Sequence, residues 1–349
     1  MPCLPCTRTR NGVRKVISAL SALAVLLVIG FAQTALAQND PLNFENNFFV
    51  TGDYVVAGAY GMNGTVVNGT TTGTISVPDQ NPSTLKANPG ITGATSVPVG
   101  AQIVGAFLYW ETVESVNHTG TGAIGSFGLK NGPSYAISGL PLPAQSSVAW
   151  SSGGCPSTST GRVVTAYRAD VRSLLPLDPN GNATPNQTYQ ITLPSSGSGA
   201  PPITLGATLV IIYRVLSKDV PLNSIVIYDG AYGQSTVNVP SSLNMLQTLQ
   251  GFYDAAASPV NRLTHIVGSG QNNKFQTVYF SSDPNNLIAL PSLYGSGQPA
   301  FPGWYGNWDN PTYTFGDTNY PYPPNLPSYP GNPVGPNTSG PPYLSLIHI

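Results

Sequence analysis

Short runs of β-branched and aromatic residues recur along the chain, and each is bounded by Gly, Pro, Asn or Ser. Thr72–Pro78 alternates apolar and polar residues, which is the pattern of a half-buried strand. Ala101–Thr112 is apolar on both faces, so it predicts a central strand. The other runs that predict strands are Phe48–Gly58, Gly161–Val171, Gln187–Pro194, Gly206–Leu216, Asn223–Gly230, Leu246–Tyr253, Asn261–Gly268 and Phe275–Ser281.

These runs predict an all-β chain, and no segment has the pattern of a βαβ unit. Only 8% of the 349 residues are charged, while Gly and Pro contribute 38 and 34 residues. Such a composition suits short strands and tight turns rather than helices. We therefore expect an antiparallel β-sandwich over residues 38–315, with a core that includes Val55, Val104, Phe107, Tyr109, Val164, Leu209, Ile211, Ile225 and Ile227.

The N-terminus has the three parts of a secretory signal peptide. Basic residues between Arg8 and Lys15 precede an apolar run that ends near Phe31, and Ala35-Leu36-Ala37 follows as a cleavage site. The apolar run is shorter than the roughly 20 residues that span a bilayer. An uncleaved anchor is the alternative. We expect residues 1–37 to be removed after Ala37, giving a secreted or cell-surface protein without a membrane span in the mature chain.

The C-terminal part changes character twice. Residues 316–343 are rich in Pro, Tyr and Asn, so we expect an extended, disordered tail with polyproline character. Residues 344–349 read LSLIHI, which is what the transposon end used to tag sequencing libraries encodes. We interpret this hexapeptide as a sequencing-adapter scar, with a natural short strand as the alternative. A scar implies that the chain is truncated at its C-terminus.

Charge excludes two classes of partner. The chain has 13 Lys and Arg residues and 14 Asp and Glu residues, and four of the basic ones lie before Ala37. Removal of the signal leaves nine basic against 14 acidic residues, a net charge of −5. Nucleic acid and anionic membrane surfaces both require clustered cations. We therefore expect neither as a partner.

Removal of the signal leaves a single cysteine in the mature chain. Cys3 and Cys6 leave with the signal, so Cys155 stands alone. An exported protein lies in a compartment that favours disulfides. Cys155 is therefore either a buried free thiol or one half of a disulfide whose partner lies in the missing C-terminal part.

The motif patterns predict no catalytic residues. The run GTGAIG at Gly120–Gly125 matches a dinucleotide-binding pattern, but no helix or suitably spaced acid follows, so we expect a flexible loop. Glu111 and Glu114 are a conceivable carboxylate pair, yet residues three apart in a strand point to opposite faces. We expect solvated charges at a strand end. The only mature histidines outside the scar are His118 and His265, too few for a His-rich metal site.

Neither a cofactor nor a metal is expected. Asp53, Asp229, Asp254 and Asp283 lie beside Gly, Tyr or Pro, where they suit Asx turns. One or two of them as oxygen ligands of Ca²⁺ is the alternative, although the spacing of an EF-hand is absent.

Aromatic residues near the start of the tail form a candidate sugar-stacking platform. These are Trp304, Tyr305, Trp308 and Tyr313. Packing onto the sandwich is the other interpretation, which we favour for Trp308 and leave open for Trp304. Trp304 and Tyr305 are therefore the candidate glycan-stacking residues.

A series of segments between Phe48 and Phe315 carries a resemblance. It resembles an uncharacterised secreted bacterial β-sandwich domain whose relatives lie near the N-terminus of large surface proteins, before immunoglobulin-like repeats or an anchoring signal. The resemblance implies a jelly-roll or galactose-binding-like style of sandwich, and it supplies no catalytic residues. It also implies a further strand with a Cys after the W-D-N segment, which this chain lacks. The segments, in order, are FFVTGDYVVAG, AFLYWETVE, VVTAYRADV, GATLVIIYR, IVIYDGA, QGFYDAA, THIVGSGQ and NWDNPTYTF.

Together these features predict an exported structural or adhesive surface module that is not an enzyme. A surface glycan or protein is the expected partner. A carbohydrate-binding module is the first alternative, resting on the aromatic residues and the low charge. An extracellular hydrolase is the second, although no nucleophile and base can be named.

Overall fold

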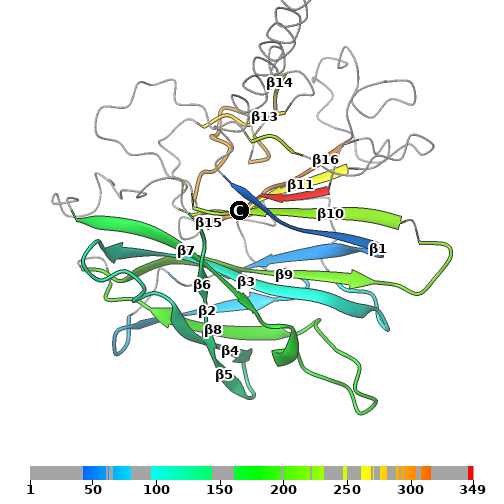
Figure 1. Cartoon of the computed structure of the whole chain (residues 1–349), viewed down its shortest axis with the longest axis horizontal. Helices are drawn as coiled ribbons and strands as arrows, with labels where there is room; N and C mark the ends of the chain where they lie inside the picture. The colour runs from blue at the N-terminus through cyan, green and yellow to red at the C-terminus, as the bar shows by residue number, and fades with distance from the viewer. Residues whose placement is uncertain are drawn as a thin grey trace, which may run out of the picture. The chain divides into compact units, whose positions relative to one another are not determined.

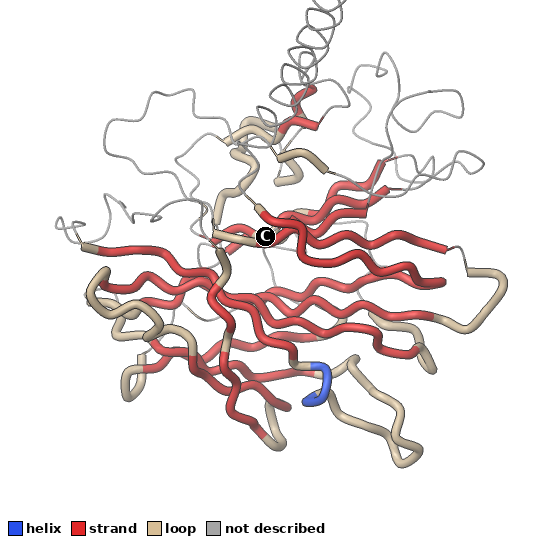
Figure 2. The backbone as a smooth tube through the Cα atoms, viewed as in Figure 1, coloured by secondary structure: helices blue, strands red, loops and turns tan. Residues whose placement is uncertain are grey.

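Strands dominate the part of the chain that the computed structural model describes, as Figure 2 shows in red. The model describes residues 42–59, 62, 66–79, 96–143, 161–197, 200–220, 222–231, 247–249, 261–268, 270, 276–280, 288–290, 292–294, 296–303, 308–315 and 345–348. The only helical element among them is one 3-10 turn, η1 (Arg172–Leu174).

The strands are β1 (Asn43–Gly58), β2 (Thr70–Ser76), β3 (Gln102–Ser115), β4 (Ile124–Leu129), β5 (Ser134–Ser138), β6 (Leu140–Pro141), β7 (Arg162–Asp170), β8 (Thr188–Pro194), β9 (Ile203–Arg214), β10 (Leu222–Asp229), β11 (Asn261–His265), β12 (Val267–Gly268), β13 (Tyr279–Phe280), β14 (Ile288–Ala289), β15 (Trp308–Asp309), β16 (Thr312–Phe315) and β17 (Ser345–His348). They all belong to one unit, formed by Pro41–Asn244 and Leu249–Ile349. A second unit joins Met1–Asp40 to Met245–Thr248. Of that unit the structure describes residues 247 and 248, where the Gln247 amide donates to the Thr248 carbonyl oxygen at 3.1 Å.

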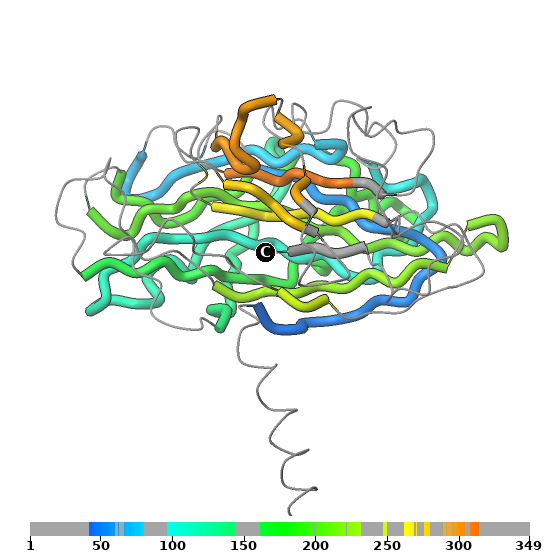
Figure 3. Tube along the Cα trace, turned by 90° about the horizontal axis from the view of Figure 1, so that it is seen from above, coloured from blue at the N-terminus to red at the C-terminus, as the bar shows by residue number. Residues whose placement is uncertain are grey.

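The largest sheet has nine strands in the order β16-β11-β17-β10-β1-β9-β3-β7-β6 (Figure 1). The two halves of the long strand β1 pair with different strands: Asn43–Thr51 pair with β10, and Gly52–Gly58 pair with β9. We call the part from β16 to Asn43–Thr51 half-sheet A, and the part from Gly52–Gly58 to β6 half-sheet B. Seen from above, the long strands lie along roughly the same axis (Figure 3).

Gly52 stands where β1 passes from one set of partners to the other. A Cβ atom there would overlap the carbonyl oxygen of Tyr213 on β9. Only glycine permits two backbones to approach this closely. The absence of a side chain at residue 52 therefore belongs to the architecture of the large sheet.

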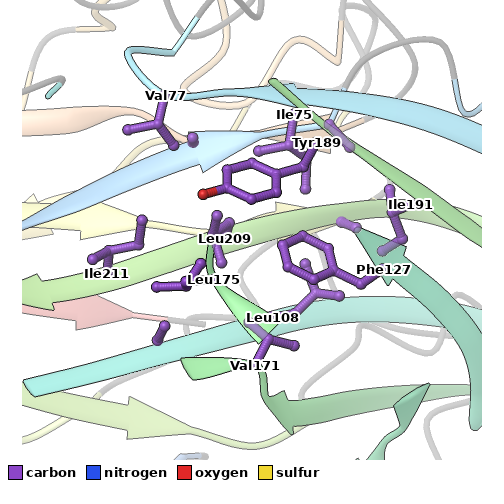
Figure 4. Close-up of a cluster of buried hydrophobic side chains, with 14 of the residues drawn as sticks. Ile75, Val77, Leu108, Phe127, Val171, Leu175, Tyr189, Ile191, Leu209 and Ile211 are labelled. Carbon is purple, nitrogen blue, oxygen red and sulfur yellow. The ribbon is translucent and has the colours of Figure 1, made fainter. Parts of the chain in front are cut away.

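Half-sheet B is covered on both faces, because successive side chains of a strand point to opposite sides. On one face it packs against a four-stranded sheet, β2-β8-β4-β5, around a core that includes Leu108, Leu209 and Tyr189 (Figure 4). On the other face, Tyr109 and Val210 join a second core with Ile225 and Ile227 of half-sheet A. The described strands thus form packed, sandwich-like layers with half-sheet B shared between two cores.

The sequence-based fold class is confirmed. The sheets are antiparallel except where β17 pairs, and the strand runs reappear with their ends shifted by a few residues. Six of the nine expected core residues are buried, while Val104, Phe107 and Val164 are half-buried and pack against the second core. The run expected to form a strand at Leu246–Tyr253 lies outside the described residues except for 247–249, which form no strand.

The structure describes only a short piece of the C-terminal part. Residues 316–343 lie outside the described residues. Ser345–His348, set aside as part of a scar, forms β17, the red strand between β10 and β11 in Figure 1. The origin of this segment stays a prediction. Among the described residues, no helix has the length and apolar character to cross a membrane.

Candidate functional site

A row of polar side chains crosses the face of half-sheet B that packs against half-sheet A. Tyr109 on β3 is the register partner of Arg168 on β7 and of Thr208 on β9. Register partners lie side by side on one face of a sheet. Glu111, two residues beyond Tyr109, lies on the same face. We call Glu111, Tyr109, Arg168 and Thr208 the polar row.

Arg168 connects the polar row to half-sheet A. Its guanidinium donates to Glu45 Oε2 at 2.7 Å and to Asp229 Oδ2, while the Tyr109 hydroxyl donates to the same Asp229 oxygen at 3.4 Å. The guanidinium carbon also lies 5.9 Å from the ring centroid of Phe107. In sheet order β1, β9 and β3 separate β7 from β10. Since Arg168 nevertheless reaches Asp229, the large sheet curls and brings its two halves face to face.

Burial and charge oppose each other in this cluster. The side chains of Asp229 and Arg168 are 4% and 13% exposed, whereas that of Glu45 is 30% exposed. Burial raises the pKa of Asp229 to about 6, against the lowering effect of the Arg168 charge. Burial by itself lowers the pKa of Arg168, but the hydrogen bond to Glu45 and the charge of Asp229 outweigh it, so its pKa is raised. Arg168 is therefore a permanent cation held between two carboxylates.

Glu111 lies under a cover made by β12 and β15. A Cβ atom at Gly268 of β12 would overlap the Glu111 carboxylate, and it would also lie 2.9 Å from the ring of Trp308. Glu111 itself is half-buried, and burial raises the pKa of its carboxyl to about 7. The expectation of a solvated charge is wrong for this residue. Two short strands that are distant in sequence enclose it.

Glu114 points to the opposite face of β3 and is fully buried. Its carboxylate accepts hydrogen bonds from the Gly120 and Gly122 amides at 2.8 and 2.6 Å, and from the Tyr167 and Thr165 hydroxyls at 2.6 and 3.1 Å. The expectation of a solvated charge is wrong here too. The run GTGAIG, expected to be a flexible loop, is held by this carboxylate at Gly120 and Gly122, and its last two residues begin β4. As the strand period predicts, Glu111 and Glu114 do not form a carboxylate pair.

The W-D-N segment, residues 308–310, binds the Thr208 end of the polar row. The Trp308 indole donates to the Thr208 hydroxyl at 2.7 Å, and that hydroxyl donates to Asn310 Oδ1 at 3.0 Å. Asp309 is fully buried and accepts from the Tyr294 hydroxyl at 2.9 Å. Trp308 is buried in the second core, which confirms its expected packing role.

The aspartates weighed as turn formers or Ca²⁺ ligands divide into two groups. Asp53 and Asp229 are strand residues in ion pairs with Arg262 and Arg168, so the turn interpretation is wrong for both. Asp254 and Asp283 lie outside the described residues. Within the described ranges, no group of three or more His, Cys, Asp or Glu side chains could hold a metal ion.

The remaining candidate residues are less informative. Trp304, Tyr305 and Cys155 all lie outside the described residues, so glycan stacking and the disulfide stay predictions. His265 is buried, with its ring edge-on to Tyr313 at a centroid distance of 5.9 Å. These surroundings indicate that His265 packs in the interior of the sandwich.

Sequence reasoning considered Glu111 and Tyr109 separately and did not connect them with Arg168 and Thr208, although a signal was present. Arg168 and Thr208 each lie inside a run that predicts a strand. A polar residue at an interior position of a buried strand needs a partner. Apolar patterning gives no means of pairing such positions across strands far apart in the chain. The row is visible only once the register is known.

Comparison of the chain with protein-family models, curated proteins and solved structures found no match.

Proposed function

We propose that this chain is an exported structural or adhesive module of the cell surface or extracellular space, and that it is not an enzyme. The signal-like N-terminus and the low charge of the sandwich support export to a site outside the cell. A surface glycan or protein is the proposed partner. The resemblance to the domain of large surface proteins, given by the ordered strand segments, agrees with this role.

The observation that carries the proposal is how the buried charges are used. Arg168 is bound by Glu45 and Asp229, and the Glu114 carboxylate accepts four hydrogen bonds. Catalytic groups need a reactive atom within reach of substrate. These charges instead bridge strands and fix a loop, which is the work of a structural module.

Three exposed apolar side chains near the ends of the β1–β10 ribbon support adhesion. Phe44, Phe49 and Leu222 are 59%, 46% and 63% exposed. The register places them on one face of the β1–β10 ribbon, opposite to Ile225 and Ile227. On the same face Val226 and Tyr228 are buried, so the exposed side chains flank a covered part of the ribbon. Exposed aromatic side chains are a common feature of binding surfaces.

Binding to immobilised glycans and extracellular-matrix proteins tests the proposal. We expect the chain to bind at least one of these surfaces, and Phe44→Ser with Phe49→Ser to weaken that binding about tenfold or more. Leu140→Ser is the matched control, because Leu140 is an exposed apolar residue outside half-sheet A. Equal binding by the Phe double variant would contradict the proposed surface, and binding to no surface would contradict adhesion.

The export step has a separate test. Expression of the full chain in a bacterium with a general secretory pathway should yield extracytoplasmic protein. N-terminal sequencing should then begin at Gln38. Retention in the cytoplasm with an intact N-terminus would contradict the signal-peptide interpretation.

A hydrolase is the second candidate, and one observation favours it. The carboxyl of Glu111 has a pKa raised to about 7, as a proton donor at neutral pH needs. Under the structural proposal, Glu111→Gln, Glu114→Gln and His265→Ala leave adhesion unchanged. Glycosidase activity that Glu111→Gln abolishes would instead favour the hydrolase.

A further inference from the structure

Strand β5 forms one edge of the four-stranded sheet (Figure 1). It pairs with β4, and within the described residues it has no neighbour on its other side. All of its residues except Ile137 are exposed. We call Ser134–Ser138, with the side that faces away from β4, the open edge.

The register with β4 decides which backbone groups of β5 point outward. At one end of the pair, the Leu129 amide donates to the Pro133 carbonyl oxygen at 3.0 Å. At the other end, the Gly139 amide donates to the Ala123 carbonyl oxygen at 2.7 Å. Residues that bond to the neighbouring strand alternate with residues that do not. The residues whose amides and carbonyls turn to the open edge are therefore Ser134, Ala136 and Ser138.

The open edge lacks the features that usually protect the edge of a sheet. Natural proteins protect such edges with charged side chains, proline, bulges or very short strands. β6, at the edge of half-sheet B, is two residues long and contains Pro141. β2, at the other edge of the four-stranded sheet, has Thr72 as its only exposed residue. β5 contains neither a charged residue nor proline, and its register with β4 is regular.

We propose that the open edge pairs with the open edge of a second copy of this chain, antiparallel and centred on Ala136. In this register Ala136 faces itself across a twofold axis, and Ser134 faces Ser138 of the second copy. Residues with outward amides and carbonyls then meet one another, and each such pair can exchange two hydrogen bonds. Because a twofold pairing of identical strands closes on itself, the product is a dimer rather than a fibre.

The side chains of β5 and its sheet suit a second copy as the partner. Ala136 is small, so two copies of it fit opposite each other at the axis. Tyr135, which is 46% exposed, comes opposite Ile137 of the second copy and packs against it. None of the strands β2, β8, β4 and β5 contains a charged residue, so no like charges meet when the two sheets join.

The dimer should be weak, because a ladder as short as β5 buries little surface compared with a stable interface. It is therefore favoured where copies are crowded. This inference does not depend on the adhesive role, since it uses a different sheet from the β1–β10 ribbon.

Sedimentation of the full chain over a range of concentrations tests the proposal. The fraction of dimer should rise with protein concentration. Ala136→Lys should weaken dimerisation about tenfold or more, because two lysines then face each other across the axis. Ala136→Pro should act in the same direction, because it removes an outward amide and leaves the hydrogen bonds to β4 in place. Thr72→Lys is the matched control, since it adds the same charge at the other edge of the same sheet, and it should leave the dimer unchanged.

Disulfide trapping tests the register. The full chains used have Cys3, Cys6 and Cys155 replaced by serine. In this background Ala136→Cys should give a disulfide-linked dimer under mild oxidation, because register partners in an antiparallel pair lie within reach of a disulfide. Thr72→Cys, exposed at the other edge, should give about tenfold less of it.

Every contrary result overturns the proposal. A chain that stays monomeric at all soluble concentrations would exclude the dimer. A dimer that survives Ala136→Lys, or one that Thr72→Lys weakens equally, would exclude the open edge as its interface. Equal trapping of the two cysteine variants would exclude the register. Circular dichroism verifies that each variant is folded, and if Ala136→Pro is not, Ala136→Lys decides, because residue 136 is exposed.

Discussion

At the residue scale, Arg168 has the largest expected effect on stability. It is the cation that Glu45 and Asp229 share, and Asp229 is almost completely buried. A buried charge that loses its partner is strongly destabilising, whereas a pair replaced by apolar residues is often tolerated. The contribution of this cluster to the free energy of unfolding therefore depends on whether each buried charge keeps its partner.

Replacing Arg168 by methionine should lower the free energy of unfolding by about 3–5 kcal/mol, because Asp229 is then left without its cation. Urea denaturation measures the effect. The double variant Arg168→Met with Asp229→Leu should recover most of the loss. A single variant within 1 kcal/mol of the unaltered chain would show that the cluster contributes little.

Glu111 predicts a dependence of stability on pH. Its carboxyl pKa is about 7 in the folded chain against an ordinary value of 4.5, so the folded state holds the proton more tightly than the unfolded state. That stability is fully present below about pH 4.5 and is lost as the pH rises through 7. The loss should be about 2 kcal/mol, less than the full shift implies because Glu111 is only half-buried. Asp229, with a pKa of about 6, acts in the same direction at lower pH.

Urea denaturation at pH 5 and pH 8 checks this sign. The unaltered chain should be more stable at pH 5, and Glu111→Gln should remove about 2 kcal/mol of the difference. If Glu111→Gln has the same pH dependence as the unaltered chain, the burial argument fails.

At the scale of elements, the connection from β3 to β4 is organised by one carboxylate. Glu114→Ala leaves the Gly120 and Gly122 amides and the Tyr167 hydroxyl without their acceptor. We expect a loss of about 2–4 kcal/mol. Hydrogen exchange should accelerate at both glycine amides, while amides in the middle of β9 change less. Unchanged protection of the two glycines would contradict this role.

The strands were predictable from the sequence to a large extent, and their partners were not. The apolar run Ala101–Thr112 predicts β3 because a strand covered on both faces has no polar side. Ile124–Leu129 and Ser134–Ser138 were missed because Gly and Ser interrupt their apolar pattern. Glu111 looked solvated because its cover comes from β12 and β15, far along the chain. Such tertiary pairings are set by register and by sheet curl, which local patterns do not contain.

At the scale of the whole sandwich, the two cores share half-sheet B, so they should unfold together. Trp110 lies in the core below half-sheet B and Trp308 in the core above it. In each variant that keeps only one of these tryptophans, the urea midpoint by fluorescence should equal the midpoint of the same variant by far-ultraviolet circular dichroism. Midpoints that differ by more than the fitting error would show that the layers unfold independently.

Strand β1 also sets the time course of folding. Asn43 pairs with Asp229, and Gly58 pairs with Thr208, so the first strand of the sandwich is completed by segments synthesised much later. Contacts between distant parts of a chain slow folding, and sheets of this kind fold in milliseconds to seconds or longer. During that interval β1 presents unpaired edges and aromatic side chains to its surroundings. A nascent copy is therefore most prone to aggregate before β9 and β10 have emerged.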